Sequence, residues 1–218
     1  MLKTERMDRV RAALRAQGLT QMIVCDPKSV WYLTGVAVEP YERLLALYLP
    51  TEGEPVLFLN RLFNVPEPPC RTVWHTDTDR PVAQIAEVVD AGRPLGIDKE
   101  WPAKFLIPLM ETHPGMQVVL SSDCVDNCRA CKDAEEQALM REASRINDAV
   151  NETAKHYIKA GMTEREVAEF IDAQFRAHGC EGPSFTTIVS FGANAADPHH
   201  EPDDTVLKEG DCVLFDMG

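Results

Sequence analysis

Apolar and polar residues follow two different periods along the first 126 residues. Spacings of three and four, as in Met7, Val10 and Leu14, predict amphipathic helices, whereas short apolar runs between polar turns predict strands. Two of these runs flank the turn at 51–54 and predict a β-hairpin around Gly53. Helices are expected over residues 4–17, 81–91 and 102–112, and strands over 21–26, 43–50, 54–60, 72–76, 94–98 and 117–122.

This alternation of strands and helices predicts an α/β domain with a mixed sheet over residues 1–126. The segment 127–132 is expected to be a linker. From Asp133 onward the pattern changes to two longer helices, which open with capping boxes at Asp133 and Thr163. Their predicted buried stripes are Leu139, Ala143, Ile146, Val150, Ala154 and Tyr157 in the first helix, and Val167, Phe170, Ile171 and Phe175 in the second.

The final stretch contains the candidate chemistry. Its pattern predicts a strand over 185–190, a polar loop, a tight turn over 208–211 and a second apolar strand over 212–217. Asp216 lies inside that second strand, where we expect its carboxylate to be buried. A buried carboxylate is costly without a positive partner, and the seven residues before Asp216 contain no Lys or Arg. A metal ion is therefore one candidate partner.

The segments IVSFGANAADPHHEPDD and LKEGDCVLFDMG resemble the pita-bread metallopeptidases, specifically the Xaa-Pro aminopeptidases and Xaa-Pro dipeptidases (prolidases). Earlier in the chain, W-Y-L-T-G and the hairpin with its E-G-E-P turn resemble the N-terminal domain of creatinase and the prolidases. R-x-x-K-D-x-E-E (129–136) and G-M-T-E (161–164) resemble the opening of the catalytic domain in the same family. The resemblance implies a creatinase N-terminal-like domain followed, over residues 133–218, by the first half of an α+β pita-bread catalytic domain.

The resemblance also implies an activity. The expected enzyme is a metal-dependent exopeptidase that hydrolyses Xaa-Pro bonds through a metal-bridging hydroxide. In that family's pattern His199 faces the proline-containing peptide substrate, and Asp216 is the first of five ligands to two divalent ions, with manganese, cobalt or zinc as candidates. The other four ligands come later in the family's chains. We therefore expect these 218 residues to be the N-terminal portion of a longer enzyme, which is not competent alone, and the resemblance implies a homodimer.

Two other functions stay open. One is a creatinase-like hydrolase of C–N bonds in a small non-peptide substrate, although creatinase-type chains lack the metal-binding Asp found here as Asp216. The other is a non-catalytic pita-bread binding protein, which the presence of both His199 and Asp216 disfavours. His200 is expected to be structural or at the rim of the site. Four acidic residues of the same loop are expected to be solvated and turn-forming: Asp197, Glu201, Asp203 and Asp204.

Composition argues against some classes of partner and indicates where in the cell the protein is located. The net charge of −13, with scattered Lys and Arg, argues against nucleic acid as a partner. No apolar run approaches the roughly 20 residues of a membrane-spanning helix. Seven cysteines, an odd number, without a signal peptide indicate reduced thiols and a cytoplasmic location. The spacing of Cys124, Cys128 and Cys131 resembles the iron–sulfur motif of radical S-adenosylmethionine enzymes, but Ala130 replaces that motif's aromatic residue and disfavours a cluster.

Overall fold

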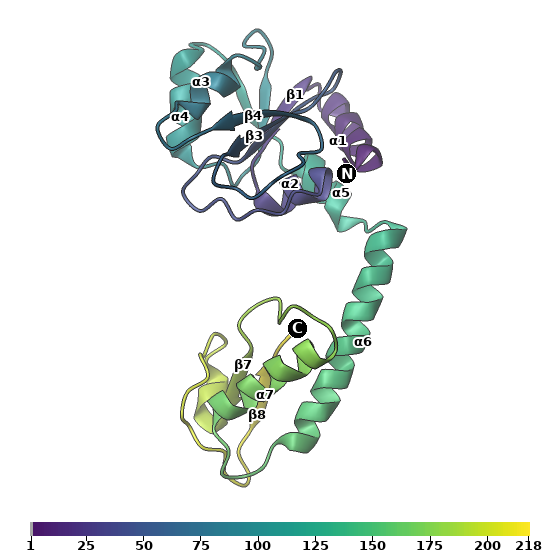
Figure 1. The fold of residues 1–218 in the computed structure, drawn as a ribbon, viewed down its shortest axis with the longest axis vertical. Helices are drawn as coiled ribbons and strands as arrows, with labels where there is room; N and C mark the ends of the chain where they lie inside the picture. Colours follow the sequence, from purple (N-terminus) through teal and green to yellow (C-terminus); the bar gives the residue numbers. More distant parts are fainter. Residues whose placement is uncertain (1) are drawn as a thin grey trace. The chain divides into compact units, whose positions relative to one another are not determined.

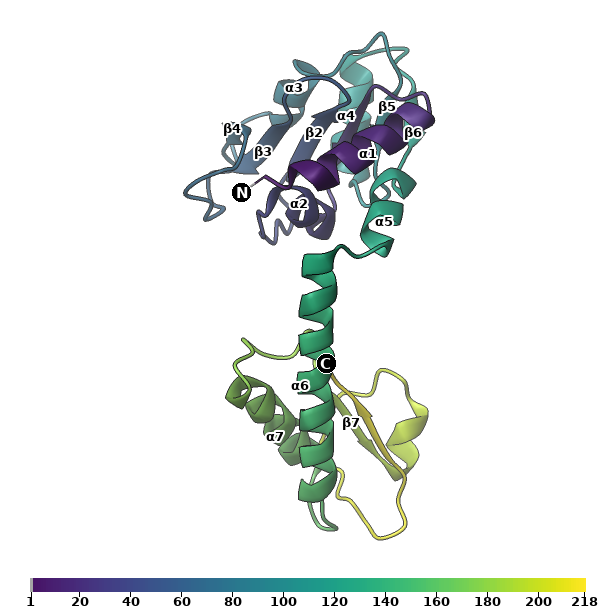
Figure 2. The ribbon, with the colours of Figure 1, turned by 90° about the vertical axis from the view of Figure 1, so that its right-hand side faces the viewer.

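A computed structural model of the protein describes residues 2–218, and Figures 1 and 2 show its two compact units. The first unit ends at Cys131 and the second begins at Lys132. Across the described range, each helix is too short or too polar to cross a membrane.

The first unit is built on a six-stranded sheet, which confirms the predicted α/β domain with a mixed sheet. Strand β1 (Gln21–Val24) pairs antiparallel with β2 and parallel with β5, so the sheet contains both kinds of pairing. All four residues of β1 are buried, because helices pack on both faces of the sheet. The strand order is β4-β3-β2-β1-β5-β6, with β2 at Ala46–Pro50, β3 at Val56–Asn60, β4 at Arg71–His75, β5 at Leu95–Ile97 and β6 at Val118–Leu120.

Five helices surround this sheet. Alternate residues of β1 point to opposite faces, so Met22 and Val24 join one hydrophobic cluster while Ile23 joins another. Helices α1, α2 and α5 contribute to the first cluster, and α3 and α4 contribute to the second. Their bounds are α1 Thr4–Ala16, α2 Pro27–Thr34, α3 Pro81–Ala86, α4 Ala103–Thr112 and α5 Asp123–Ala130.

The segment predicted as a linker, 127–132, differs in the structure. Most of it belongs to α5, in which Cys124 and Val125 are buried in the first cluster. These two apolar side chains make the helix part of the first unit. The three cysteines of this segment lie in different environments, with Cys124 buried in the first cluster, Cys128 half-buried and Cys131 exposed.

The second unit consists of two helices and a two-stranded antiparallel sheet. Both predicted capping boxes are confirmed, since the side chains of Asp133 and Thr163 accept from the backbone N–H groups of Glu136 and Glu166. The core between helices and sheet contains Val150, Ala154, Val167, Ile171, Phe175, Val189 and Phe191. The elements are α6 (Ala134–Tyr157), α7 (Glu164–Ala177), β7 (Ile188–Phe191), the 3₁₀ turn η1 (Gly192–Ala196) and β8 (Val213–Asp216).

The predicted stripe of α6 is only partly buried. Val150 and Ala154 are buried, but Leu139 is 66% exposed, because the core of the second unit reaches only the later part of the helix. The predicted strand over 185–190 is also displaced, since β7 begins at Ile188 and includes Phe191. The exposure of Leu139 has a simple cause: periodicity shows which residues are apolar, but not which of them another element covers.

Candidate functional site

The pairing of β7 with β8 decides which way Asp216 faces. Asp216 lies opposite Ile188, and Leu214 lies opposite Ser190, so these four side chains share one face of the sheet. The other face carries Val189, Phe191, Val213 and Phe215, which belong to the hydrophobic core. Asp216 therefore faces away from the core.

The expectation that Asp216 is buried is wrong for this chain. The residue is exposed, and none of the four residues of β8 is fully buried. Within the described residues β8 pairs only with β7, so its outer edge has no neighbouring strand. Burial therefore gives no reason for this carboxylate to need a compensating charge.

Asp216 nevertheless has the chemistry of a metal ligand. Among residues 2–218 no hydrogen bond or ion pair occupies its carboxylate, so both oxygens are free to accept a cation. Ser190, on the same sheet face, carries a buried hydroxyl that also lacks a hydrogen-bond partner within the described part of the chain. Carboxylate oxygens suit manganese, zinc and cobalt ions, but a single carboxylate is too few ligands for a stable site. The residues present therefore fit one part of a metal centre.

His199 lies in the connection between β7 and β8 and is exposed. Its backbone N–H donates to Asp197 Oδ1 over 3.0 Å, which forms a local turn. No hydrogen bond joins the His199 ring to any other described residue, so the ring is available to a ligand. Within residues 2–218, neither the His199 ring in the loop nor the Asp216 carboxylate on the following strand has a hydrogen-bond partner.

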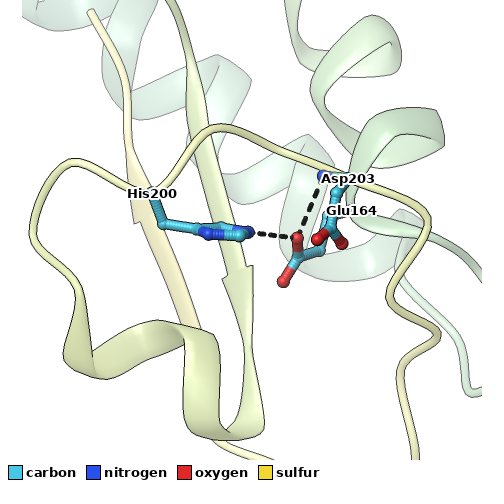
Figure 3. Close-up of side chains that lie close together, drawn as sticks. All are labelled: Glu164, His200 and Asp203. Carbon is cyan, nitrogen blue, oxygen red and sulfur yellow. Dashed lines mark hydrogen bonds and ion pairs between the residues drawn. The ribbon is translucent and has the colours of Figure 1, made fainter.

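The most connected polar group of this unit is Glu164, which the sequence reasoning did not single out (Figure 3). Its side chain is fully buried at the first position of α7. Oε1 accepts from the Phe191 backbone N–H at 2.7 Å and from Asn194 Nδ2 at 3.0 Å. Oε2 lies 2.6 Å from His200 Nε2 and accepts from the Asp203 backbone N–H at 3.1 Å. One carboxylate therefore holds four groups.

Glu164, His200 and Asp203 place one ligand atom each within 4.8 Å of one another, which is compatible with a metal ion. Hydrogen bonding explains the grouping without an ion, because both oxygens of Glu164 already accept from two donors each. The hydrogen bond from Glu164 raises the pKa of His200 above its ordinary value, and hydrogen bonds from Thr205 lower the pKa of Asp203. We interpret these hydrogen bonds as holding the loop between β7 and β8 against the start of α7.

The predicted tight turn before β8 is confirmed by the bond from the Asp211 backbone N–H to the carbonyl of Lys208, at 3.2 Å. Asp211 also approaches Gly192, where a Cβ atom would lie 3.3 Å from its carboxylate. Gly192 has φ +54°, and its N–H donates to the Cys212 carbonyl at 2.8 Å. Glycine is thus favoured where the loop that carries His199 leaves β7.

Two family comparisons cover most of the chain. Residues 6–131 match the family described as Creatinase/Prolidase N-terminal domain. Residues 138–218 match the family described as Metallopeptidase family M24. The two matches follow the division of the chain into its two compact units.

Individual relatives agree with these matches. A Staphylococcus aureus (strain bovine RF122 / ET3-1) protein named "Uncharacterized peptidase SAB1567" is 32% identical over 204 residues, which are 89% of this chain and 56% of that protein. The dipeptidase PepE from Mycobacterium ulcerans has a TM-score of 0.87 at 30% identity, over 99% of this chain and 60% of its own. A recombinant prolidase from Thermococcus sibiricus has a TM-score of 0.89 at 28% identity, over 100% and 62%. The chain thus spans less than two thirds of the length of these relatives.

Proposed function

Because the chain belongs to the creatinase/prolidase family, with a Creatinase/Prolidase N-terminal domain followed by a segment of metallopeptidase family M24, we propose that the whole protein is a metal-dependent exopeptidase that cleaves Xaa-Pro bonds. A hydrolase of the peptidase class is what the family itself supports. The preference for proline is the finer step, and it draws on the likeness to a solved prolidase and a solved dipeptidase.

One observation in this chain carries the proposal. Asp216 is an acidic residue at the end of a strand, on the sheet face away from the core, with no partner among residues 2–218. A purely structural aspartate would be expected to cap a turn or to pair with a cation, as Asp211 caps the neighbouring turn through Lys208. Asp216 does neither, so its carboxylate is free to bind a ligand.

In the proposed enzyme Asp216 holds a divalent ion, together with ligands outside these 218 residues. Divalent ions at such a centre activate water as a nucleophile at neutral pH. His199 donates a hydrogen bond to the substrate carbonyl oxygen, where negative charge develops during hydrolysis. Its exposed and unoccupied ring is suited to that contact. In this proposal Asp216 binds the ion and His199 binds the substrate.

The test is an assay of the full-length protein, loaded with Mn²⁺, on Xaa-Pro dipeptides and on longer peptides that begin with Xaa-Pro. Matched Xaa-Ala peptides control for proline preference, and creatine tests the alternative C–N hydrolase. We expect turnover of at least one Xaa-Pro class, its loss on chelation, and little turnover of Xaa-Ala. Turnover of creatine alone, or of no substrate at all, would refute the proposal.

A further inference from the structure

The loop that carries His199 is held on both sides of this residue by one side chain, that of Glu164. Of the four groups held by Glu164, Phe191 and Asn194 precede His199 in the chain, while His200 and Asp203 follow it. The groups bound to one carboxylate thus lie on both sides of His199. Figure 3 shows the last two, with His200 approaching Glu164 from the loop and Asp203 beside it.

Backbone bonds strengthen this closure at the start of α7. The N–H of Glu164 donates to the Thr205 carbonyl at 3.2 Å, and the N–H of Arg165 donates to the Asp203 carbonyl at 3.1 Å. These are helix N-terminal N–H groups, which have no partner inside the helix. Asn194 Nδ2 also donates to Thr205 Oγ1 at 3.1 Å. The loop carbonyls therefore accept from backbone N–H groups at the start of α7, and these hydrogen bonds hold the loop against the helix.

His199 has no such attachment of its own. Its ring is exposed, and the hydrogen bond that His199 makes is the one from its backbone N–H to Asp197. The position of the ring is therefore inherited from its neighbours, and His200 is the adjacent residue with a buried anchor. We propose that Glu164 is a positioning residue for His199, acting through His200 and the loop closure; this inference rests on the proposed function.

A change at Glu164 can be followed at the His200 ring. The charged groups that face His200 are acidic, since Glu164 forms the hydrogen bond and Asp197 and Asp203 lie nearby. The neutral amide of Asn194 lies 3.2 Å from the same ring nitrogen. Glu164 is the first cause of the raised pKa of His200, so removing its charge lowers that pKa. The titration of the His200 ring thus reports on the contact between His200 and Glu164, through which the positioning of His199 is proposed to act.

The experiment compares Glu164→Gln with Glu169→Gln in the full-length protein. Glu169 is an exposed glutamate on the same helix and serves as the matched control. Glutamine keeps the size of the side chain but replaces one acceptor with an NH₂ donor, which opposes the donors already there. We expect Glu164→Gln to lower kcat by roughly 10- to 100-fold with a smaller change in KM, because a small misplacement of a catalytic contact has costs of this order. Glu169→Gln keeps the parental kcat.

Histidine ring NMR of the same proteins provides the second readout, with His199→Gln and His200→Gln used to assign the two rings. Glu164→Gln lowers the pKa of His200 and shifts the His199 ring resonances, whereas Glu169→Gln changes neither. Unchanged His199 resonances in Glu164→Gln overturn the inference whether or not the protein is a peptidase. Absence of Xaa-Pro turnover in the parent refutes the proposed function instead. If Glu164→Gln does not fold, His200→Gln replaces it in the kinetic comparison, and parental kcat in that variant also overturns the inference.

Discussion

Asp216→Asn separates a ligand role from a structural role most clearly. The substitution keeps the size of the side chain and removes its charge. Asp216 is exposed and makes no hydrogen bond or ion pair within residues 2–218, so we expect its loss to change the free energy of unfolding by less than about 0.5 kcal/mol. For a protein of this size class that corresponds to a melting temperature within about 2 °C of the parent.

The effect on activity is expected to be much larger. Even partners that only orient a metal ligand cost about 10- to 100-fold in metal affinity or activity when removed. Loss of a charged ligand itself is therefore expected to cost at least about 100-fold in kcat/KM. The assay measures kcat/KM on an Xaa-Pro peptide across a Mn²⁺ titration, with metal content determined on the same full-length protein.

Asp211→Asn is the matched control, because Asp211 lies five residues earlier and has a structural role. Its Oδ2 accepts from the Lys208 backbone N–H at 2.9 Å, and an asparagine oxygen can still accept this bond without the charge, so this variant should lose at most about 1 kcal/mol of stability while it keeps its metal. Parental metal content and parental kcat/KM in Asp216→Asn would refute the reasoning. A loss of stability above about 2 kcal/mol in that variant would instead assign Asp216 a structural role.

Three further outcomes are expected. His199→Gln lowers kcat by about 100-fold or more with an unchanged melting temperature, because the ring is exposed and forms no hydrogen bond to another described residue; equal kcat would exclude it from the site. Gly192→Ala lowers stability by about 1 kcal/mol or more in a denaturant titration, because φ is +54° and the new Cβ would lie 3.3 Å from Asp211; an unchanged midpoint would show that the loop relaxes. The third outcome concerns pH, because Glu164 raises the pKa of His200. The bond between these two side chains stabilises the fold fully below the ordinary pKa of His200. Its contribution is lost as pH rises through the raised pKa. The stability difference between the parent and His200→Gln should therefore shrink with rising pH, and a difference that grows would contradict the assignment.

Local signals in the sequence predicted much of the fold. The capping boxes at Asp133 and Thr163 and the hairpin around Gly53 each depend on residues a few positions apart, and all three are present. The α/β domain with a mixed sheet, followed by the first half of a pita-bread domain, is likewise confirmed.

What could not be predicted depends on contacts between distant residues. Glu164 is 27 residues from Phe191 and 39 from Asp203, and nothing in the helix pattern distinguishes it from the capping residue Glu166. The exposure of Leu139 and Asp216 was missed for a related reason, since an apolar pattern does not say whether another element covers it. The burial of Glu164 at the start of α7 follows only from the three-dimensional structure.

The most direct test of the account is a crystal structure of the full-length protein with Mn²⁺ and a non-hydrolysable Xaa-Pro peptide, in which anomalous scattering locates the ions. We expect an ion about 2.0–2.2 Å from a carboxylate oxygen of Asp216, and the His199 ring within hydrogen-bonding distance of the peptide carbonyl. An ion held instead by Glu164, His200 and Asp203, with Asp216 free in solvent, would contradict it.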